Sequence, residues 1–224
     1  MVTLKTIYMK RLNLIVLFVL TSFFVQAQEN RPFYSEINNF KKKDSLEFPP
    51  KNAVLFVGSS TFTNWKDAQK YFPTHTIINR GFGGSSLPHV IGYANDIIFP
   101  YHPKQIVIYC GENDFTGNAT AQVVVDRVKE LFTLIRNKYP KVYIAYISIK
   151  PSPSREKYLP QMVAANKMIA EMIKGMKRAQ FINTYDAMFT ASGEMMNDIF
   201  LKDNLHMNAK GYAIWAKIME PYLK

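Results

Sequence analysis

Five short apolar segments recur along this chain, and they limit its fold more than any other feature. As a group they have the length of β-strands, contain many β-branched and aromatic residues, and show little alternation between apolar and polar positions. Segments of this kind are typical of parallel strands that are buried on both faces. They are AVLFVG (53–58), HTIINR (75–80), QIVIYC (105–110), KVYIAYIS (141–148) and QFINT (180–184).

Helical patterns fill the intervals between these segments. The clearest covers 119–138, where apolar residues recur at spacings of three and four. The alternation of strands and helices predicts an α/β fold, a three-layer α/β/α sandwich around a central, mainly parallel five-stranded sheet. Other helices are expected at 35–40, 87–98, 156–174 and 209–223.

The N-terminus has the parts of a secretory signal peptide. Three cations precede an apolar stretch over 12–25, and a cleavage site follows at Ala27, although a start at Met9 would give a more typical basic region. An uncleaved membrane anchor is the alternative, but the apolar stretch is shorter than the roughly 18 residues that a spanning helix needs. We therefore expect a signal peptide over 1–27 and a secreted or periplasmic protein, with no stable membrane insertion after cleavage.

The rest of the 224-residue chain is short enough for one domain. A polar, proline-interrupted lead-in is expected over 28–52, and the domain itself over 53–224. The formal charge of the whole chain is +11, and three of these cations lie in the signal segment. Apart from Lys41-Lys42-Lys43 the cations are scattered, and no nucleic-acid-binding motif accompanies them. This distribution indicates a solvated surface, so we expect no nucleic-acid partner.

The sequence predicts neither a cofactor nor a bound metal. Cys110 is the only cysteine, and the four histidines form no cluster with it that would suggest a zinc site. No Walker A sequence is present, and the segment 81–86 lacks the third glycine of a dinucleotide fingerprint.

Polar residues gather directly after the expected strands, where parallel sheets bind their ligands. Serine, glycine and asparagine in these positions, with an Asp and a His before the last helix, are the parts of an acyl-transfer site. The segments are Gly58-Ser59-Ser60-Thr61, Asn79-Arg80-Gly81-Phe82-Gly83-Gly84-Ser85-Ser86, Gly111-Glu112-Asn113-Asp114 and Lys202-Asp203-Asn204-Leu205-His206-Met207-Asn208. A further polar segment, Ser148-Ile149-Lys150-Pro151-Ser152-Pro153, follows the fourth strand.

Each segment taken alone has a purely structural explanation. Either serine of the first could cap a helix, the glycines of the second could form a turn, the third could cap the long helix, and the last could be a surface loop. The nucleophile elbow G-x-S-x-G of the α/β-hydrolases is also absent. Only the joint occurrence of the four segments, in this order and at these strand ends, favours catalysis.

Four blocks carry a specific resemblance. They are FVGSS (56–60), NRGFGGSS (79–86), GEND (111–114) and DNLHMNAKGY (203–212), and ISIKPSPSR (147–155) extends the likeness. The sequence resembles the SGNH hydrolases, also called the GDSL family of esterases and lipases, and in particular their small secreted bacterial members of the platelet-activating-factor acetylhydrolase type. The resemblance implies a flavodoxin-like fold. One departure is Ser59, which stands where the family usually has Asp and removes no catalytic group.

The resemblance implies a serine esterase that works through an acyl-enzyme. Ser60 matches the family's nucleophile, His206 its general base, and Asp203 the carboxylate that orients the imidazole. The oxyanion hole would consist of the backbone N–H groups of Ser60 and Gly81 and the side chain of Asn113.

The expected substrate is a small-molecule or polysaccharide ester with a short or acetyl acyl group, on a carbohydrate in the favoured interpretation. A lysophospholipid or another short acyl lipid is the alternative, and a non-catalytic glycan-binding module of the same fold is a less favoured one. Five aromatic residues near the blocks could line a sugar or acyl site, or could equally be core packing: Phe62, Trp65, Phe82, Tyr93 and Phe115.

Overall fold

A computed structural model describes residues 31–224 of the chain. The expected signal peptide over 1–27 and its cleavage after Ala27 therefore lie outside the described residues, as does the start of the lead-in. Five strands form one sheet in the order β2-β1-β3-β4-β5, and every neighbouring pair is parallel. The strands are β1 (Val54–Gly58), β2 (Ile77–Gly81), β3 (Gln105–Tyr109), β4 (Tyr143–Ile147) and β5 (Ala179–Ile182).

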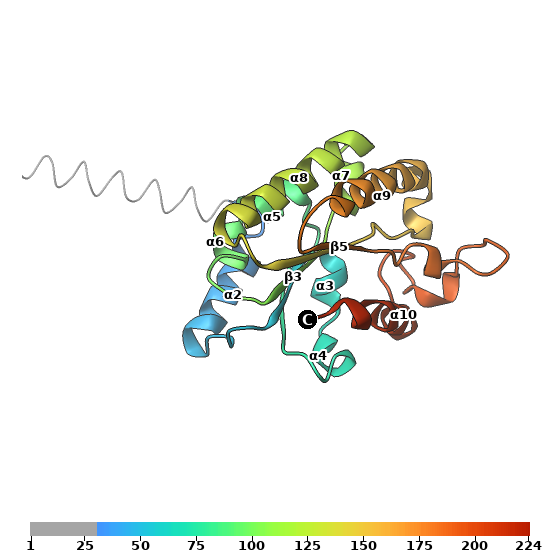
Figure 1. The fold of residues 1–224 in the computed structure, drawn as a ribbon. Coiled ribbons are helices and arrows are strands. Elements are labelled where there is room, and N and C mark those ends of the chain that lie inside the picture. Colours follow the sequence, from blue (N-terminus) through green and yellow to red (C-terminus); the bar gives the residue numbers. More distant parts are fainter. Residues whose placement is uncertain (1–30) are drawn as a thin grey trace, which may run out of the picture.

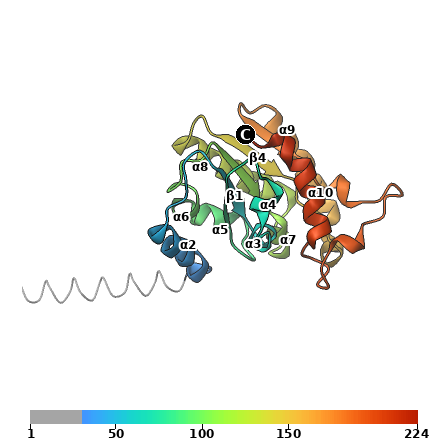
Figure 2. The same ribbon diagram turned by 90° about the horizontal axis from the view of Figure 1, so that it is seen from below.

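Helices cover both faces of the sheet, which confirms the predicted three-layer α/β/α arrangement (Figure 1). One face carries α2 (Tyr34–Leu46), α5 (Leu87–Gly92), α6 (Ala94–Ile97), α8 (Ala121–Lys138) and α9 (Leu159–Lys174). The other face carries α3 (Ser60–Asn64), α4 (Ala68–Tyr71) and α10 (Ala209–Met219), as the second view also shows (Figure 2). Shorter elements are α7 (Glu112–Thr116), η1 (Pro153–Tyr158), η2 (Asp186–Met188), η3 (Asn197–Ile199) and η4 (Glu220–Tyr222).

The strands are apolar on both faces because each face has its own core. Leu55 and Val57 of β1 pack into the cluster beneath α8 and α9. Val54 and Phe56, which alternate with them, pack into the cluster beneath α3 and α10. A strand buried on both sides cannot show the apolar–polar alternation of a half-exposed strand, which explains the continuous apolar segments of the sequence.

The structure differs from the predicted helices mainly at their ends. The helix expected at 35–40 extends over Tyr34–Leu46, and the one expected at 87–98 is divided into α5 and α6 around Tyr93. α3, α4 and α7 were not predicted, because elements of four or five residues are too short to show a helical period. Among residues 31–224, no helix combines the length and apolarity that crossing a membrane requires.

Candidate active site

The turn that follows β1, residues 58–61 and here called the serine turn, packs tightly against β3. The amide of Ser59 donates to the carbonyl of Tyr109 at 3.0 Å. A Cβ on Gly58 would lie 1.8 Å from that same carbonyl oxygen, and φ of Gly58 is +144°, so only glycine fits. β1 can therefore end abruptly and lead directly into α3.

The two serines of this turn differ in access to solvent. Ser59 is the residue before α3, and its side chain is buried, with 3% of the residue exposed. Ser60 is the first residue of α3 and is half-buried. In the part of the chain that the structure describes, neither the hydroxyl nor the amide of Ser60 makes a hydrogen bond. Ser60 is thus the more accessible of the two serines, and the one whose hydroxyl is unengaged.

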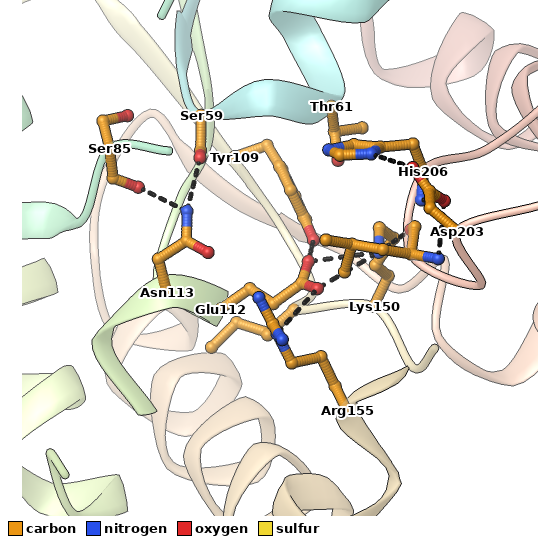
Figure 3. Close-up of polar contacts among 12 residues, drawn as sticks. Ser59, Thr61, Ser85, Tyr109, Glu112, Asn113, Lys150, Arg155, Asp203 and His206 are labelled. Atoms are coloured by element: carbon orange, nitrogen blue, oxygen red, sulfur yellow. Dashed lines mark hydrogen bonds and ion pairs between the residues drawn. The ribbon is translucent and has the colours of Figure 1, made fainter. Parts of the chain in front are cut away.

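The side chain of Asn113, on α7, lies beside the serine turn (Figure 3). Its amide nitrogen donates to the hydroxyl of Ser59 at 2.9 Å and to the carbonyl of Ser85 at 3.0 Å. The nitrogen has two hydrogens, so both are engaged in this structure. Asn113 can bind a further acceptor only by sharing or releasing one of these bonds.

In the glycine turn, residues 81–84 at the end of β2, one backbone amide has a hydrogen-bond partner and two others have none. The amide of Gly81 donates to the side-chain oxygen of Asn79 at 3.0 Å, and a Cβ at Gly81 would lie 2.6 Å from Cβ of Phe62. Gly81 therefore allows α3 to approach β2, and its N–H has a partner already. The amides of Gly83 and Gly84 make no hydrogen bond within residues 31–224, and Gly84 is exposed.

Asp203 and His206 lie together on the loop before α10, residues 203–206 and here called the histidine loop. Nδ1 of His206 is 2.6 Å from Oδ2 of Asp203, and Oδ1 of Asp203 accepts from the amides of Leu205 and His206, both at 3.0 Å. The hydrogen bond from the imidazole is the main cause that lowers the pKa of Asp203 to about 2. Because the carboxylate is ionised and accepts from Nδ1–H, Nε2 of a neutral imidazole is left as an acceptor.

Contacts between α3 and α10 tie the histidine loop to the serine turn. The hydroxyl of Tyr212 donates to the carbonyl of Thr61, the neighbour of Ser60, at 2.8 Å. The rings of Trp65 and Tyr212 stack with centroids 4.8 Å apart. No hydrogen bond joins Ser60 to His206, and Nε2 of His206 has no partner within the described residues.

Of the predicted site residues, the structure thus joins Asp203 to His206 and places Asn113 against the serine turn, while Gly81 has a packing role. The five aromatic residues that could have lined a substrate site are at most 4% exposed and belong to the core: Phe62, Trp65, Phe82, Tyr93 and Phe115.

A buried ion pair beside the site has no counterpart in the sequence-based assignment. Lys150, three residues beyond β4, lies 3.1 Å from Glu112, and both are buried. The two residues are part of the blocks ISIKPSPSR and GEND, but neither carries an assigned role there. The signal that could have indicated the pair is a lysine placed between an apolar strand and a proline. A lysine that is buried beside a strand end needs a partner of opposite charge, because lysine is rarely buried unpaired.

Among residues 31–224, no group of three or more His, Cys, Asp or Glu side chains is arranged to hold a metal ion. A groove of about 510 Å³ opens beside Gly81 between α2 and α3, and charged side chains line it together with Phe40. Thr63, the fourth residue of α3, is part of the lining, and its hydroxyl donates to the carbonyl of Ser59 in the serine turn at 3.3 Å.

Several solved structures share this fold. A protein from Streptococcus pneumonia that is provisionally described as a platelet activating factor matches with a TM-score of 0.74 and 20% identity, over 94% of this chain and 99% of that one. A GDSL-like lipase from Bacteroides thetaiotaomicron matches with a TM-score of 0.67 and 19% identity, over 83% and 96%. A carbohydrate esterase of family 3 from Talaromyces cellulolyticus gives 0.59 and 15%, over 76% and 95%.

The sequence itself was compared with curated proteins and with family models. No curated protein matches the chain. The model described as the GDSL-like Lipase/Acylhydrolase family matches residues 56–214, which include all four blocks. The chain therefore belongs to the GDSL-like lipase/acylhydrolase family of ester-cleaving hydrolases, as the four blocks predicted.

Proposed function

We propose that this protein is a serine esterase that removes short acyl groups, acetyl foremost, from carbohydrate esters through an acyl-enzyme on Ser60. The observation that carries the proposal is the Asp203–His206 pair, in which a 2.6 Å contact fixes the imidazole with Nε2 as its acceptor. An imidazole held in this way is a general base, and a base needs a hydroxyl nucleophile to activate. The family supplies the reaction class, ester cleavage.

Ser60 is the better of the two candidate nucleophiles. The hydroxyl of Ser59 is buried and accepts a hydrogen bond from Asn113, whereas Ser60 is half-buried and its hydroxyl is unengaged. A nucleophile must reach an acyl carbon in the substrate, so access favours Ser60. Ser59 then supports Asn113 rather than reacting.

The reaction follows from these roles. Oγ of Ser60 attacks the ester carbonyl while Nε2 of His206 takes its proton, and the tetrahedral intermediate expels the alcohol, which receives that proton from His206. Water then attacks the acyl-enzyme while the same imidazole takes one of its protons. The second tetrahedral intermediate breaks its bond to Oγ of Ser60, which receives that proton from His206, and the carboxylic acid is released. Asp203 stays ionised throughout and stabilises the imidazolium.

The negative oxygen of the intermediate needs N–H donors. The amide of Ser60 is unengaged, and the side chain of Asn113 can share one of its two hydrogen bonds. The amide of Gly81, the third donor that the family pattern suggests, would have to break its hydrogen bond to Asn79. The amides of Gly83 and Gly84 in the same turn have no hydrogen-bond partner within residues 31–224. Fixed donors of this kind contribute most when they are held before the substrate arrives.

The surroundings favour a short acyl chain. Among residues 31–224, the exposed large apolar side chains are spread over the molecule, and Leu201 alone lies near the histidine loop. A long acyl chain would need an apolar wall to be desolvated, which argues against a lysophospholipid. The fold shared with a carbohydrate esterase supports a sugar as the alcohol. The basic, then apolar, N-terminal segment supports export, where polysaccharide esters are accessible.

The test is a series of p-nitrophenyl esters with acyl chains of two, four and eight carbons. We expect kcat/KM to be highest for the acetyl ester and to fall with chain length. Ser60→Ala should lower kcat by about 10⁴-fold or more. Ser45→Ala, which removes an exposed hydroxyl on α2, is the matched control and should not change it. A serine-directed phosphonate should label Ser60 in the wild type.

Hydrolysis that persists in Ser60→Ala would refute this nucleophile. Acetate release from acetylated xylan, compared with fatty acid release from lysophosphatidylcholine, tests the alcohol and acyl groups directly. Faster release from the lipid would refute the carbohydrate assignment and leave the esterase intact.

A further inference from the structure

The strongest unassigned feature is the buried pair of Lys150 and Glu112. Lys150 is 1% exposed and Glu112 is 6% exposed. The ammonium lies 3.1 Å from one oxygen of the carboxylate and 3.3 Å from the other. The hydroxyl of Tyr109 donates to the same carboxylate at 2.7 Å. Burying such a pair costs desolvation free energy that its mutual attraction often fails to offset, so stability alone is a poor explanation for it.

A third contact of the ammonium indicates a different role for the pair. Nζ of Lys150 donates to the carbonyl of Leu205 at 2.8 Å. Leu205 lies between Asp203 and His206, so this hydrogen bond holds the backbone of the histidine loop one residue before the imidazole. Burial is the main cause that lowers the pKa of Lys150, and the nearby Glu112 opposes that shift.

The histidine loop has few other inward attachments. Asp203 and Asn204 are exposed, and Leu205 and His206 are only half-buried, so the loop has little core of its own. Besides Lys150, the amide of Ser154 donates to the carbonyl of Asn204 at 3.0 Å. Leu201, just before the loop, donates from its amide to the carbonyl of His206 at 2.8 Å and accepts from the amide of Asn204 at 2.9 Å. A loop held by so few contacts depends on each of them for its position.

Glu112 connects this anchor to the other half of the site. It is the first residue of α7, and Asn113, which contacts Ser59, is the second. In Figure 3, Glu112 and Lys150 lie between Asn113 on one side and Asp203 with His206 on the other. A chain of polar contacts thus runs from the helix that carries Asn113, through Glu112 and Lys150, to the carbonyl of Leu205.

We propose that Lys150 and Glu112 are positioning residues, which hold the histidine loop at a fixed place relative to Asn113 and the serine turn. The inference rests on the proposed function. Neither residue touches the substrate, since both are buried and their polar atoms are engaged with each other and with the protein. A displacement of about 1 Å at a catalytic group can cost about 10²-fold in rate, so a loss of this anchor should be visible in kcat.

The test uses the double variant Lys150→Met with Glu112→Gln in the full chain. Replacing one member alone would leave the other charge buried and unpaired and could prevent folding, whereas the double variant removes both charges at similar volume. We expect kcat for p-nitrophenyl acetate to fall about 10²-fold with KM nearly unchanged. The pH profile should keep its acid limb, because the general base itself is retained. Hydrogen exchange of the Leu205 and His206 amides should become faster.

Arg136→Met is the matched control, since Arg136 also donates to backbone carbonyls, those of Val142, Lys177 and Arg178, away from the site. It should lower the thermal midpoint without changing kcat.

A double variant with the kcat and the amide exchange of the wild type would overturn the proposal. A loss of kcat in Arg136→Met as large as that in the double variant would also overturn it, since the effect would then be one of general stability. The exchange measurement needs no catalysis, so it tests the anchor even if the wild type cleaves no ester, which would be a failure of the proposed function alone.

Discussion

The two halves of the candidate site are built in opposite ways. The half that contains the serine turn and Asn113 is embedded in the ends of the strands, and Ser59 is only 3% exposed. The half that contains the histidine loop lies at the surface, with 47% of the Asp203 side chain and 24% of the His206 side chain exposed. The first is positioned by packing around β1 and β3, and the second by a few hydrogen bonds.

This difference has consequences for mutation. Residues in the packed half should resist displacement, so a substitution there acts mainly by removing one group. In the histidine loop, Asp203 both orients the imidazole and organises the turn through two backbone amides. A substitution there can remove a function and displace its neighbours together. Removing a side chain from the packed half should therefore displace its neighbours less than removing one from the loop.

The largest effect should come from the loop. His206→Ala removes the proposed general base, and we expect kcat for an acetyl ester to fall by about 10⁴–10⁶-fold. Asp203→Asn should cost less, about 10⁴-fold, because the imidazole remains but loses its orientation. Stopped assays on folded protein, checked by circular dichroism, would measure both.

His75→Ala provides the matched control, because His75 contacts the carbonyl of Lys224 and not the site. It should leave kcat unchanged. If His206→Ala retained more than a tenth of the wild-type rate, another residue would have to be the base.

A smaller effect is expected in the packed half. Asn113→Ala should lower kcat about 10²–10³-fold, as removal of an oxyanion donor does in other hydrolases. Ser59→Ala should cost up to about tenfold, because it removes one hydrogen bond that orients Asn113. Since the two side chains touch, kcat of the double variant should be no lower than that of Asn113→Ala alone.

Strictly additive losses of kcat would contradict this coupling between Ser59 and Asn113. Thr133→Ala, on the exposed side of α8, serves as a neutral control.

The sequence predicted local features of both halves. The strand segments and the four blocks indicated the sheet, its layers and which strand ends carry polar residues, because burial on both faces leaves a strong apolar signal. The Asp203–His206 contact also followed from a spacing of three residues within one loop. Local patterns are visible in a sequence because they depend on few residues.

Contacts between distant segments were not predictable in this way. Ser59 was expected at most to cap a helix, and its hydrogen bond to Asn113 depends on how α7 packs against the serine turn. The amide of Gly81 was expected to bind an oxyanion, but the side chain of Asn79 engages it. Lys150 and Glu112 are 38 residues apart in sequence, and only the fold brings them together beneath Leu205. Such contacts follow from tertiary packing, which no local pattern encodes.

The smallest expected difference between the two halves concerns the pKa values of their carboxyl groups. Asp114, in the packed half, is buried beneath α5, and burial raises its pKa in spite of the hydrogen bonds from Leu87 and Arg127. Asp203 is exposed, and its hydrogen bond with His206 lowers its pKa to about 2. The titration midpoints of the two carboxyl carbons, measured by NMR, should therefore lie on opposite sides of the ordinary value of about 3.9. Identical midpoints for the two groups would contradict the contrast.

The lowered pKa of Asp203 predicts how the stability of the fold changes with pH. A carboxyl group that is more acidic in the folded state stabilises the fold above its unfolded pKa, near 4, and this contribution disappears as the pH falls toward 2. Because the side chain is 47% exposed, solvent screens the interaction, and its contribution should be below about 1 kcal/mol. Asp203→Asn should thus lower the thermal midpoint by up to about 4 °C at pH 6, and the difference from the wild type should vanish near pH 2. A difference that stayed constant between these pH values would mean that the ionised carboxylate orients the imidazole for catalysis without stabilising the loop.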